Sequence, residues 1–227
     1  MTAPTGVADV VIPARGGSVS IPGKNAALVD GRPMLVRAVQ TSTAARTVGR
    51  VFVSTDSDQL AQLATSGGAV VVARPDDLAG PDASTESAVL HALTSLDRLA
   101  EVTCIVQCTS PMLMPADVDA AVDLLWDHGY DAVFTACEVH EFLWRRDSTL
   151  RGVNHDPSAR PLRQHVVPDL RENGAVYAMR TTGFQQARHR FFGTLGVSLM
   201  PPERSIDVDE PWELAVADAL ARRQSSR

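Results

Sequence analysis

A glycine-rich loop with two cations follows the first β-branched run of the sequence. It spans residues 14–25 and reads ARGGSVSIPGKN, with Arg15 and Lys24 on either side of the glycines. Glycine lets backbone N–H groups point at an anion, and Ser18 and Ser20 add hydroxyl donors. We interpret the segment as a phosphate-binding loop, against the alternative of a flexible turn in which the glycines only make the bend.

Spacing excludes two familiar phosphate motifs. The P-loop pattern G-x-x-x-x-G-K-[ST] fails because five residues separate Gly17 from Gly23, and Asn25 stands where a hydroxyl is needed. The dinucleotide pattern G-x-G-x-x-G is also absent. The loop therefore predicts a phosphate site of another kind.

Two late carboxylates, Asp207 and Asp209, stand at alternate positions before the C-terminal segment. In an extended chain, side chains at i and i+2 share one face, so both can reach one cation. Mg²⁺ binds one or two carboxylates together with phosphate oxygens and water. The alternative is a pair of solvated acids, with Asp209 as the N-cap of the following helix, and spacing alone does not choose between them.

The elements that must position these groups alternate between strand-like and helix-like segments. Short runs rich in Val and Ile are separated by segments with helical spacing, which predicts an α/β fold with an open, mostly parallel sheet and helices on both faces. The predicted strands are residues 7–13, 50–54, 69–73, 103–107, 132–136, 174–179 and 195–200, and the predicted helices are 33–47, 56–65, 84–99, 115–128, 181–188 and 209–223.

One stretch breaks this alternation. Residues 138–172 are polar and rich in arginine, with no helical period. So long an irregular stretch is uncommon inside a compact domain. We therefore expect an α/β core over residues 1–137, an inserted arm or flap with β-hairpin character over 138–172, and completion of the core over 173–227.

Composition restricts the partners. The formal net charge is −6, whereas a nucleic-acid groove needs an excess of Lys and Arg, so no nucleic acid is expected. Three cysteines without ligand spacing predict buried thiols in a reducing cytoplasm, not disulfides or zinc. With no secretory leader and no long apolar run, we expect a cytoplasmic protein without a membrane partner.

The phosphate loop resembles that of the CMP-N-acylneuraminate (CMP-sialic acid) synthetases, which belong to the nucleotidyltransferases with a Rossmann-like sheet. Further segments occur in the family's order, so the resemblance covers nearly the whole chain. They are Ser54-Thr55-Asp56-Ser57, Arg74-Pro75 with Asp82-Ala83-Ser84-Thr85, Gln107-Cys108-Thr109-Ser110-Pro111, Glu172-Asn173-Gly174-Ala175-Val176-Tyr177 and Ile206-Asp207-Val208-Asp209.

This resemblance implies Mg²⁺-dependent transfer of CMP from CTP to a nonulosonic (sialic-type) sugar acid, with release of pyrophosphate. Catalysis would rest on Arg15, Lys24, Asp207 and Asp209, and the two aspartates would bind the metal. The nucleotide would be bound by Ala14, Arg15, Gly16, Ser18, Lys24, Asn25, Arg74, Ala83 and Thr85. Without the resemblance, Arg74 is typical of a surface arginine before a proline turn.

The acceptor side is also implied by the resemblance. Gln107 follows a buried strand, at the edge where open α/β sheets bind ligands, and the family uses the matching glutamine on the acceptor. Asn173 precedes a strand and could hydrogen-bond acceptor hydroxyls; for both residues the alternative is turn chemistry. Arg163 would face the acceptor carboxylate, which suits arginine, although it could also be one more cation of a basic arm. In the family such an arm reaches across a dimer, which implies a homodimer.

Departures from the family leave the acceptor open. Val19-Ser20 replaces the usual Lys-Gly, Cys108 replaces a proline, and Lys24 is the only lysine in the chain. The missing cation removes a contact to phosphate of roughly 1.5–3 kcal/mol. A small phosphonate or a 3-deoxy-octulosonic acid are therefore alternative acceptors, and a non-catalytic CTP-binding homologue is the alternative to an enzyme.

Overall fold

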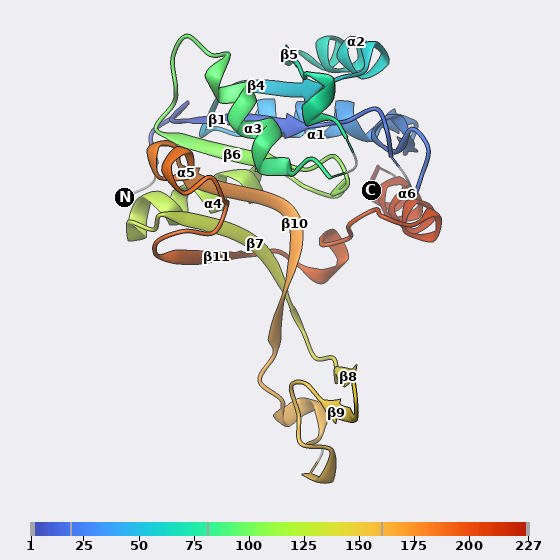
Figure 1. Ribbon diagram of the computed structural model, residues 1–227. Helices are drawn as coiled ribbons and strands as arrows, with labels where there is room; N and C mark the ends of the chain where they lie inside the picture. Colours follow the sequence, from blue (N-terminus) through green and yellow to red (C-terminus); the bar gives the residue numbers. More distant parts are fainter. Residues whose placement is uncertain (1–2, 19, 81, 160, 226–227) are drawn as a thin grey trace.

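The described part of the chain is organised around a seven-stranded sheet (Figure 1). The computed structural model describes residues 3–18, 20–80, 82–159 and 161–225. The strands of the sheet are β1 (Ala8–Pro13), β4 (Val48–Thr55), β5 (Val70–Ala73), β6 (Val102–Val106), β7 (Ala132–Val139), β10 (Asp169–Arg180) and β11 (Leu195–Leu199). They lie in the order β11-β7-β10-β6-β1-β4-β5, and β10 alone runs antiparallel to its neighbours. The expected mostly parallel, Rossmann-like sheet is confirmed.

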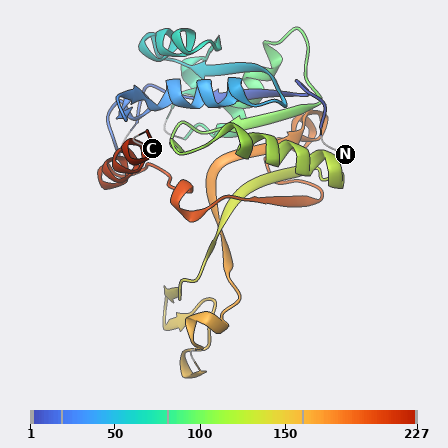
Figure 2. The ribbon, with the colours of Figure 1, turned by 180° about the vertical axis from the view of Figure 1, so that it is seen from behind.

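Helices cover both faces of this sheet. The helices are α1 (Met34–Ala44), α2 (Asp58–Gly67), α3 (Thr85–Thr94), α4 (Pro115–His128), α5 (Thr181–Ala187) and α6 (Pro211–Ser225), and α6 lies beside the sheet (Figure 1). Figure 1 shows α3 and α5 in front of the sheet, and Figure 2 shows α1 and α4 over the opposite face. The helix predicted over 84–99 stops at Thr94, because the hydroxyls of Thr94 and Ser95 bond back to the His91 carbonyl and compete with the helix.

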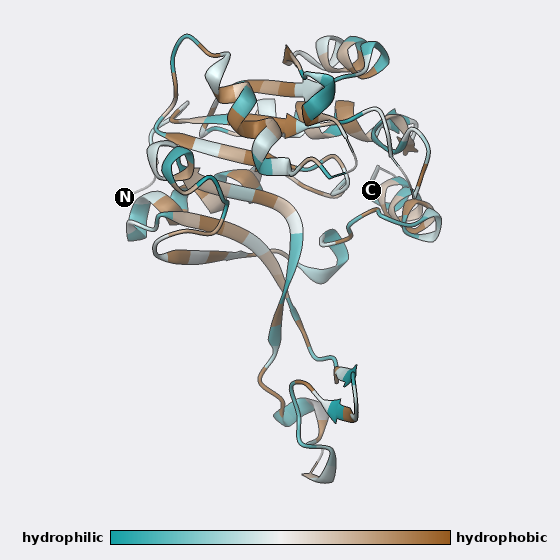
Figure 3. Cartoon of the chain, viewed as in Figure 1, coloured by the Kyte–Doolittle hydropathy of each residue, from teal (hydrophilic) through white to brown (hydrophobic). Residues whose placement is uncertain are grey.

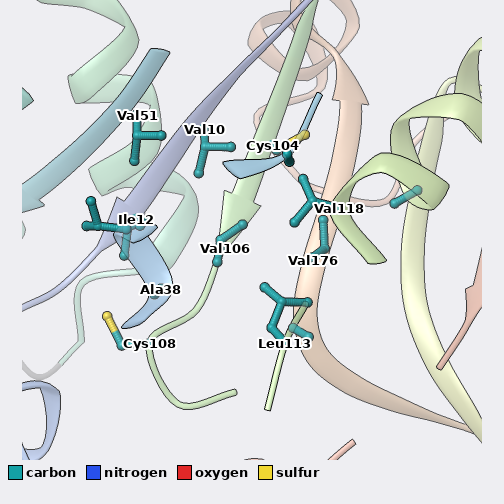
Figure 4. Packing of buried hydrophobic residues seen from close by; sticks show 14 of the residues in the cluster. Val10, Ile12, Ala38, Val51, Cys104, Val106, Cys108, Leu113, Val118 and Val176 are labelled. Carbon is teal, nitrogen blue, oxygen red and sulfur yellow. The ribbon is translucent and has the colours of Figure 1, made fainter. Parts of the chain in front are cut away.

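Apolar packing on the two faces explains why the central strands read as β-branched runs. Val10 on β1 and Val106 on β6 are fully buried, and Figure 4 shows them with Val118 of α4 in the larger of two apolar clusters. Parallel strands covered on both faces have no solvent side, so they carry no polar alternation. Cys104 and Cys108 lie in the same cluster, and burial raises the pKa of both thiols to about 12.

A short ribbon connects the phosphate loop to α1 and was not expected. After a 3-10 turn, η1 (Lys24–Ala26), strands β2 (Leu28–Val29) and β3 (Arg32–Pro33) pair across Asp30 and Gly31, which both have positive φ. Asp-Gly with two positive φ angles is the usual two-residue hairpin turn.

Within the described residues, no helix combines the length and apolar content that a membrane crossing requires.

The arm grows directly out of the sheet. The β7–β10 ladder runs from Ala132 opposite Met179 to Val139 opposite Asp169, so it crosses both predicted boundaries of the arm. Beyond it lie the hairpin β8 (Trp144–Arg146) and β9 (Leu150–Gly152) and two short turns, η3 (Pro157–Ala159) and η4 (Arg163–His165). The arm extends away from the core and mixes polar and apolar residues (Figure 3).

Two predicted strands, 132–136 and 174–179, are therefore shorter than the strands observed. A two-stranded ribbon outside the core has solvent on both faces, so its residues show no apolar period that would mark it as strand.

Candidate active site

A cavity of about 320 Å³ lies where β1, β4, β5 and β6 end, which is the edge at which open α/β sheets bind ligands. Most of the residues singled out from the sequence line it together. They are Arg15, Lys24, Asn25, Arg74, Ala83, Thr85, Gln107, Asp207 and Asp209, with Pro13, Ser84, Cys108 and Thr109 completing the wall. The cavity therefore combines three cations with two carboxylates.

The phosphate loop is fixed by one group outside it and by one of its own side chains. The Asp56 carboxylate, just after β4, accepts a hydrogen bond from the Gly16 N–H at 2.9 Å, and Asn25 Nδ2 donates to the Arg15 carbonyl at 3.0 Å. A Cβ on Gly16 would lie 3.0 Å from the Ser57 side chain, so a larger residue here would push against Ser57. Asp56 belongs to a segment noted in the sequence but was given no role there. An acid directly after a strand end was the signal for it.

Three predicted loop contacts, Ala14, Gly16 and Ser18, do not line the cavity wall. Ala14 is fully buried and donates its backbone N–H to the Ser54 carbonyl at 2.9 Å, and Ser18 is partly buried but does not line the cavity. Arg15 donates to the Gly80 carbonyl at 3.2 Å, which links the loop to the segment before α3.

Arg74 is buried, so the interpretation as a surface arginine is wrong. Only 8% of the residue is exposed, and its guanidinium donates to the Ser54 hydroxyl at 3.1 Å and the Ser54 carbonyl at 2.6 Å. Burial lowers the pKa of Arg74, and the Asp56 carboxylate opposes that shift. Since arginine stays protonated in proteins, a fixed positive charge faces the cavity.

The two late aspartates occupy different environments. Asp209 is exposed, and its carboxylate accepts from Lys24 Nζ at 2.8 Å. At the start of α6, the Glu213 carboxylate reaches back and accepts from the N–H groups of Asp209 and Glu210. Asp207 is largely buried, which raises the pKa of its carboxyl, while a hydrogen bond from the Thr109 side chain lowers it. Its Oδ1 is buried with no hydrogen-bond partner.

Gly174 brings the acceptor side and the carboxylates together. Its φ is +72°, and a Cβ there would lie 2.9 Å from Gln107 Oε1 and 3.3 Å from Asp207 Oδ2. A side chain at this position would displace both groups. Gly174 was part of a motif noted in the sequence without a role, and a glycine inside a strand-like run was its signal.

The other two predicted acceptor residues lie outside this cavity. Asn173 is buried, with its amide hydrogen-bonded inside the protein, and it lines a neighbouring cavity of about 350 Å³ that also touches Asp207. Arg163 belongs to η4 in the arm, and its side chain lies outside the described part of the structure. In one copy of the chain the arm points away from the core (Figure 1).

An ion pair beside the site fixes the start of α3, which carries Thr85. Arg190 Nε donates to Glu86 at 2.6 Å, and both side chains are mostly buried. The Arg190 guanidinium lies 4.5 Å from the centroid of the Tyr177 ring, and the Tyr177 hydroxyl donates to Glu172. The contacts from Glu86 through Arg190 and Tyr177 to Glu172 therefore connect the start of α3 to the base of the arm.

Comparison with known proteins identifies the family. Residues 10–215 match the family model described as cytidylyltransferase. The chain belongs to the cytidylyltransferase family. An N-acylneuraminate cytidylyltransferase A from Danio rerio is 32% identical over 218 residues, which cover 94% of this chain and 50% of the relative. A 3-deoxy-manno-octulosonate cytidylyltransferase from Rhodopseudomonas palustris is 34% identical over 143 residues, 62% of this chain and 55% of that protein.

A solved synthetase structure shares the fold. The structure of CMP:2-keto-3-deoxy-manno-octonic acid synthetase complexed with CTP superposes with a TM-score of 0.72 at 18% identity, covering 96% of this chain and 99% of that one. The chain spans about half the length of the curated relatives it matches.

Proposed function

We propose that this cytidylyltransferase family member moves CMP from CTP to a small acidic acceptor, a nonulosonic (sialic-type) sugar acid, and releases pyrophosphate. The main support is one cavity in which Arg15, Lys24 and Arg74 face Asp207 and Asp209. The Danio relative is named as an acylneuraminate enzyme, and the name of the synthetase structure includes CTP. Nucleotidyl transfer needs phosphate charge neutralised and an acceptor placed in line, and this set of groups suits both tasks.

Mg²⁺ is part of the proposal, and the donor set fits it. The buried, unpartnered Asp207 Oδ1 is a hard oxygen ligand without another function in the described structure, and Asp209 lines the same cavity. No group of three or more acidic, Cys or His side chains suited to a metal exists among the described residues, so phosphate oxygens and water would complete the shell. When bound, Mg²⁺ would neutralise charge on the pyrophosphate group.

The chain's own residues would then bind and orient the reactants. Arg15 and Lys24 bind the phosphates, and the cavity wall at Ala83 and Thr85 receives the cytidine. Gln107 orients the acceptor hydroxyl, whose oxygen attacks the α-phosphorus. A new O–P bond forms, the bond from the α-phosphorus to pyrophosphate breaks, and the hydroxyl proton is released to water or to the leaving pyrophosphate. No covalent enzyme intermediate is needed.

We further propose a homodimer formed through the arm, in a cytoplasmic setting. Several large apolar side chains of the arm are exposed, and exposed apolar surface of this kind is typical of an interaction site. They are Leu143, Trp144, Leu150, Val153, Leu162 and Val167. In a dimer, the arm of a second copy would bring its Arg163 to the acceptor carboxylate. The three free, buried cysteines suit a reducing compartment.

Pyrophosphate release tests the proposal. The assay combines CTP, Mg²⁺ and one acid at a time: a nonulosonic acid, a 3-deoxy-octulosonic acid or a small phosphonate. We expect release with the nonulosonic acid, and loss of about 10²-fold or more in Asp207→Asn, which keeps the shape but removes the charge. If CTP binds in calorimetry but no acid supports release, the chain is a non-catalytic CTP-binding homologue. If CTP does not bind, the nucleotide assignment itself is wrong.

A further inference from the structure

The strand that carries Asn173 is irregular at that residue. The register of β10 against β7 breaks between Glu172 and Tyr177, and an irregularity of this kind re-aims side chains beside functional sites. Thr135 of β7 spans the break, because its hydroxyl accepts from the Val176 N–H at 2.9 Å and lies 2.6 Å from Asn173 Oδ1. Thr135 is 1% exposed, so this contact is shielded from water.

The amide of Asn173 is saturated by the protein itself. Its Oδ1 accepts from Thr135 and from the Ala175 N–H at 3.2 Å, and its Nδ2 donates to Ser205 Oγ at 3.0 Å and Met200 Sδ at 3.3 Å. An amide offers two acceptor sites and two donor hydrogens, and all four are used. The Ala175 N–H can only donate, which fixes the orientation of the amide. No group is left for an acceptor hydroxyl.

Ser205 carries this network into the segment that bears the aspartates. It is 4% exposed, stands two residues before Asp207, and donates to the Pro201 carbonyl at 3.0 Å. On the other side of Asp207, the Val208 N–H donates to the Thr109 carbonyl at 2.8 Å, and Val208 is fully buried. The backbone is therefore fixed on both sides of a carboxylate whose Oδ1 has no partner of its own.

We propose that Thr135, Asn173 and Ser205 form a buried strut that holds the Asp207 carboxylate in the geometry its cation requires. Asn173 is then a positioning residue and makes no contact with the acceptor. Groups that orient a metal ligand affect metal affinity without touching the metal, and a buried polar network is rigid when every member is paired. The inference rests on the proposed Mg·CTP site and deepens it.

The test measures how much Mg²⁺ increases the affinity for CTP. Calorimetry measures CTP binding with and without Mg²⁺ and compares the wild type with Ser205→Ala and Thr135→Val. Neither residue lines the cavity that contains Arg15, Lys24 and Asp209. We expect the affinity without Mg²⁺ to be unchanged and the gain from Mg²⁺ to fall about tenfold. Turnover at low Mg²⁺ should fall and recover at high Mg²⁺.

The matched control is Thr103→Val. It breaks another buried hydroxyl pair, Thr103 with Thr181 at 2.9 Å, on the β6–α5 side of the core. The strut is supported if Thr103→Val keeps the wild-type Mg²⁺ dependence while Ser205→Ala and Thr135→Val lose part of it. If all three variants keep wild-type Mg²⁺ dependence, the strut is wrong. If Ser205→Ala raises only the acceptor KM, the strut is wrong and Asn173 has an acceptor role.

The proposed function can fail separately. If no acid supports pyrophosphate release by the wild type, the transferase proposal is wrong, and the calorimetric comparison still decides the strut. If Mg²⁺ gives the wild type no gain in CTP affinity, there is no cation to position and the strut is rejected as well.

Discussion

Arginines are used differently in the cavity and in the arm. Arg74 and Arg190 are mostly buried and hydrogen-bonded within the core, whereas Arg145 and Arg146 on β8 are exposed. Apolar residues follow the same division, since the central strands β1 and β6 are buried on both faces while Trp144 on β8 is half exposed. The cavity is thus preorganised within one chain, whereas the described part of the arm leaves large apolar side chains exposed.

The largest expected effect concerns the buried ion pair of the core. Glu86→Gln removes one partner of a mostly buried pair and should lower the free energy of unfolding by about 3 kcal/mol at neutral pH. Burial raises the pKa of Glu86, but the hydrogen bond from Arg190 and other favourable interactions outweigh it, so the pKa lies below its usual 4.5.

The sign of that shift gives the pH dependence. A lowered folded-state pKa means that the carboxylate stabilises the fold above pH 4.5, and this contribution is lost as the pH falls through the folded-state pKa. Urea unfolding across this range should show the gap between wild type and variant closing in acid. The exposed Glu203→Gln serves as control, and a gap that does not vary with pH would contradict the assignment.

Next in size is a pair of glycine substitutions that separates strain from site geometry. Gly174 and Gly31 share a φ of +72°, so alanine at either pays the same backbone cost of about 1–2 kcal/mol. Only at Gly174 does the new Cβ meet Gln107 and approach Asp207, while Gly31 has open space. We expect Gly174→Ala to lower kcat/KM about 10²-fold and Gly31→Ala to leave it unchanged. Equal losses would mean that strain alone explains the effect.

A smaller effect, on association, is expected at the β8–β9 hairpin of the arm. Trp144 packs edge-on against His155 and remains half exposed, as an interface anchor would. Trp144→Ser should weaken dimerisation by about 2 kcal/mol in sedimentation equilibrium, with little change in the stability of each copy. Leu195→Ser, at a similarly exposed position on β11, is the control. A wild type that sediments as a monomer at all concentrations would refute the dimer.

The smallest effect is expected for an ion pair within the arm. Arg151 and Asp147 lie 3.4 Å apart, but both side chains are about half exposed. Solvent screens such pairs, so Arg151→Ala should change the free energy of unfolding by less than about 0.5 kcal/mol. A loss as large as that of Glu86→Gln would show that the arm is as tightly integrated as the core.

Local patterns predicted the core well and the arm poorly. Helix α4 begins at Pro115 and ends at His128 as expected, because proline opens it and Gly129 closes it in a left-handed conformation. The central strands are apparent as Val-rich runs because both faces are buried. The extensions of β7 and β10 into the arm carry no such pattern, since they lack a buried face.

The amino-acid sequence by itself determined which chemical groups the protein has, and the order of the elements that carry them. Side-chain type, burial period and turn residues are local properties, so Arg15, Lys24 and the two late aspartates could be singled out directly. The tertiary structure decided which groups meet: Lys24 bonds Asp209 across 185 positions, Gly174 brings Gln107 near Asp207, and an irregular strand turns Asn173 inward. Such contacts depend on strand register between distant segments, which no local pattern encodes.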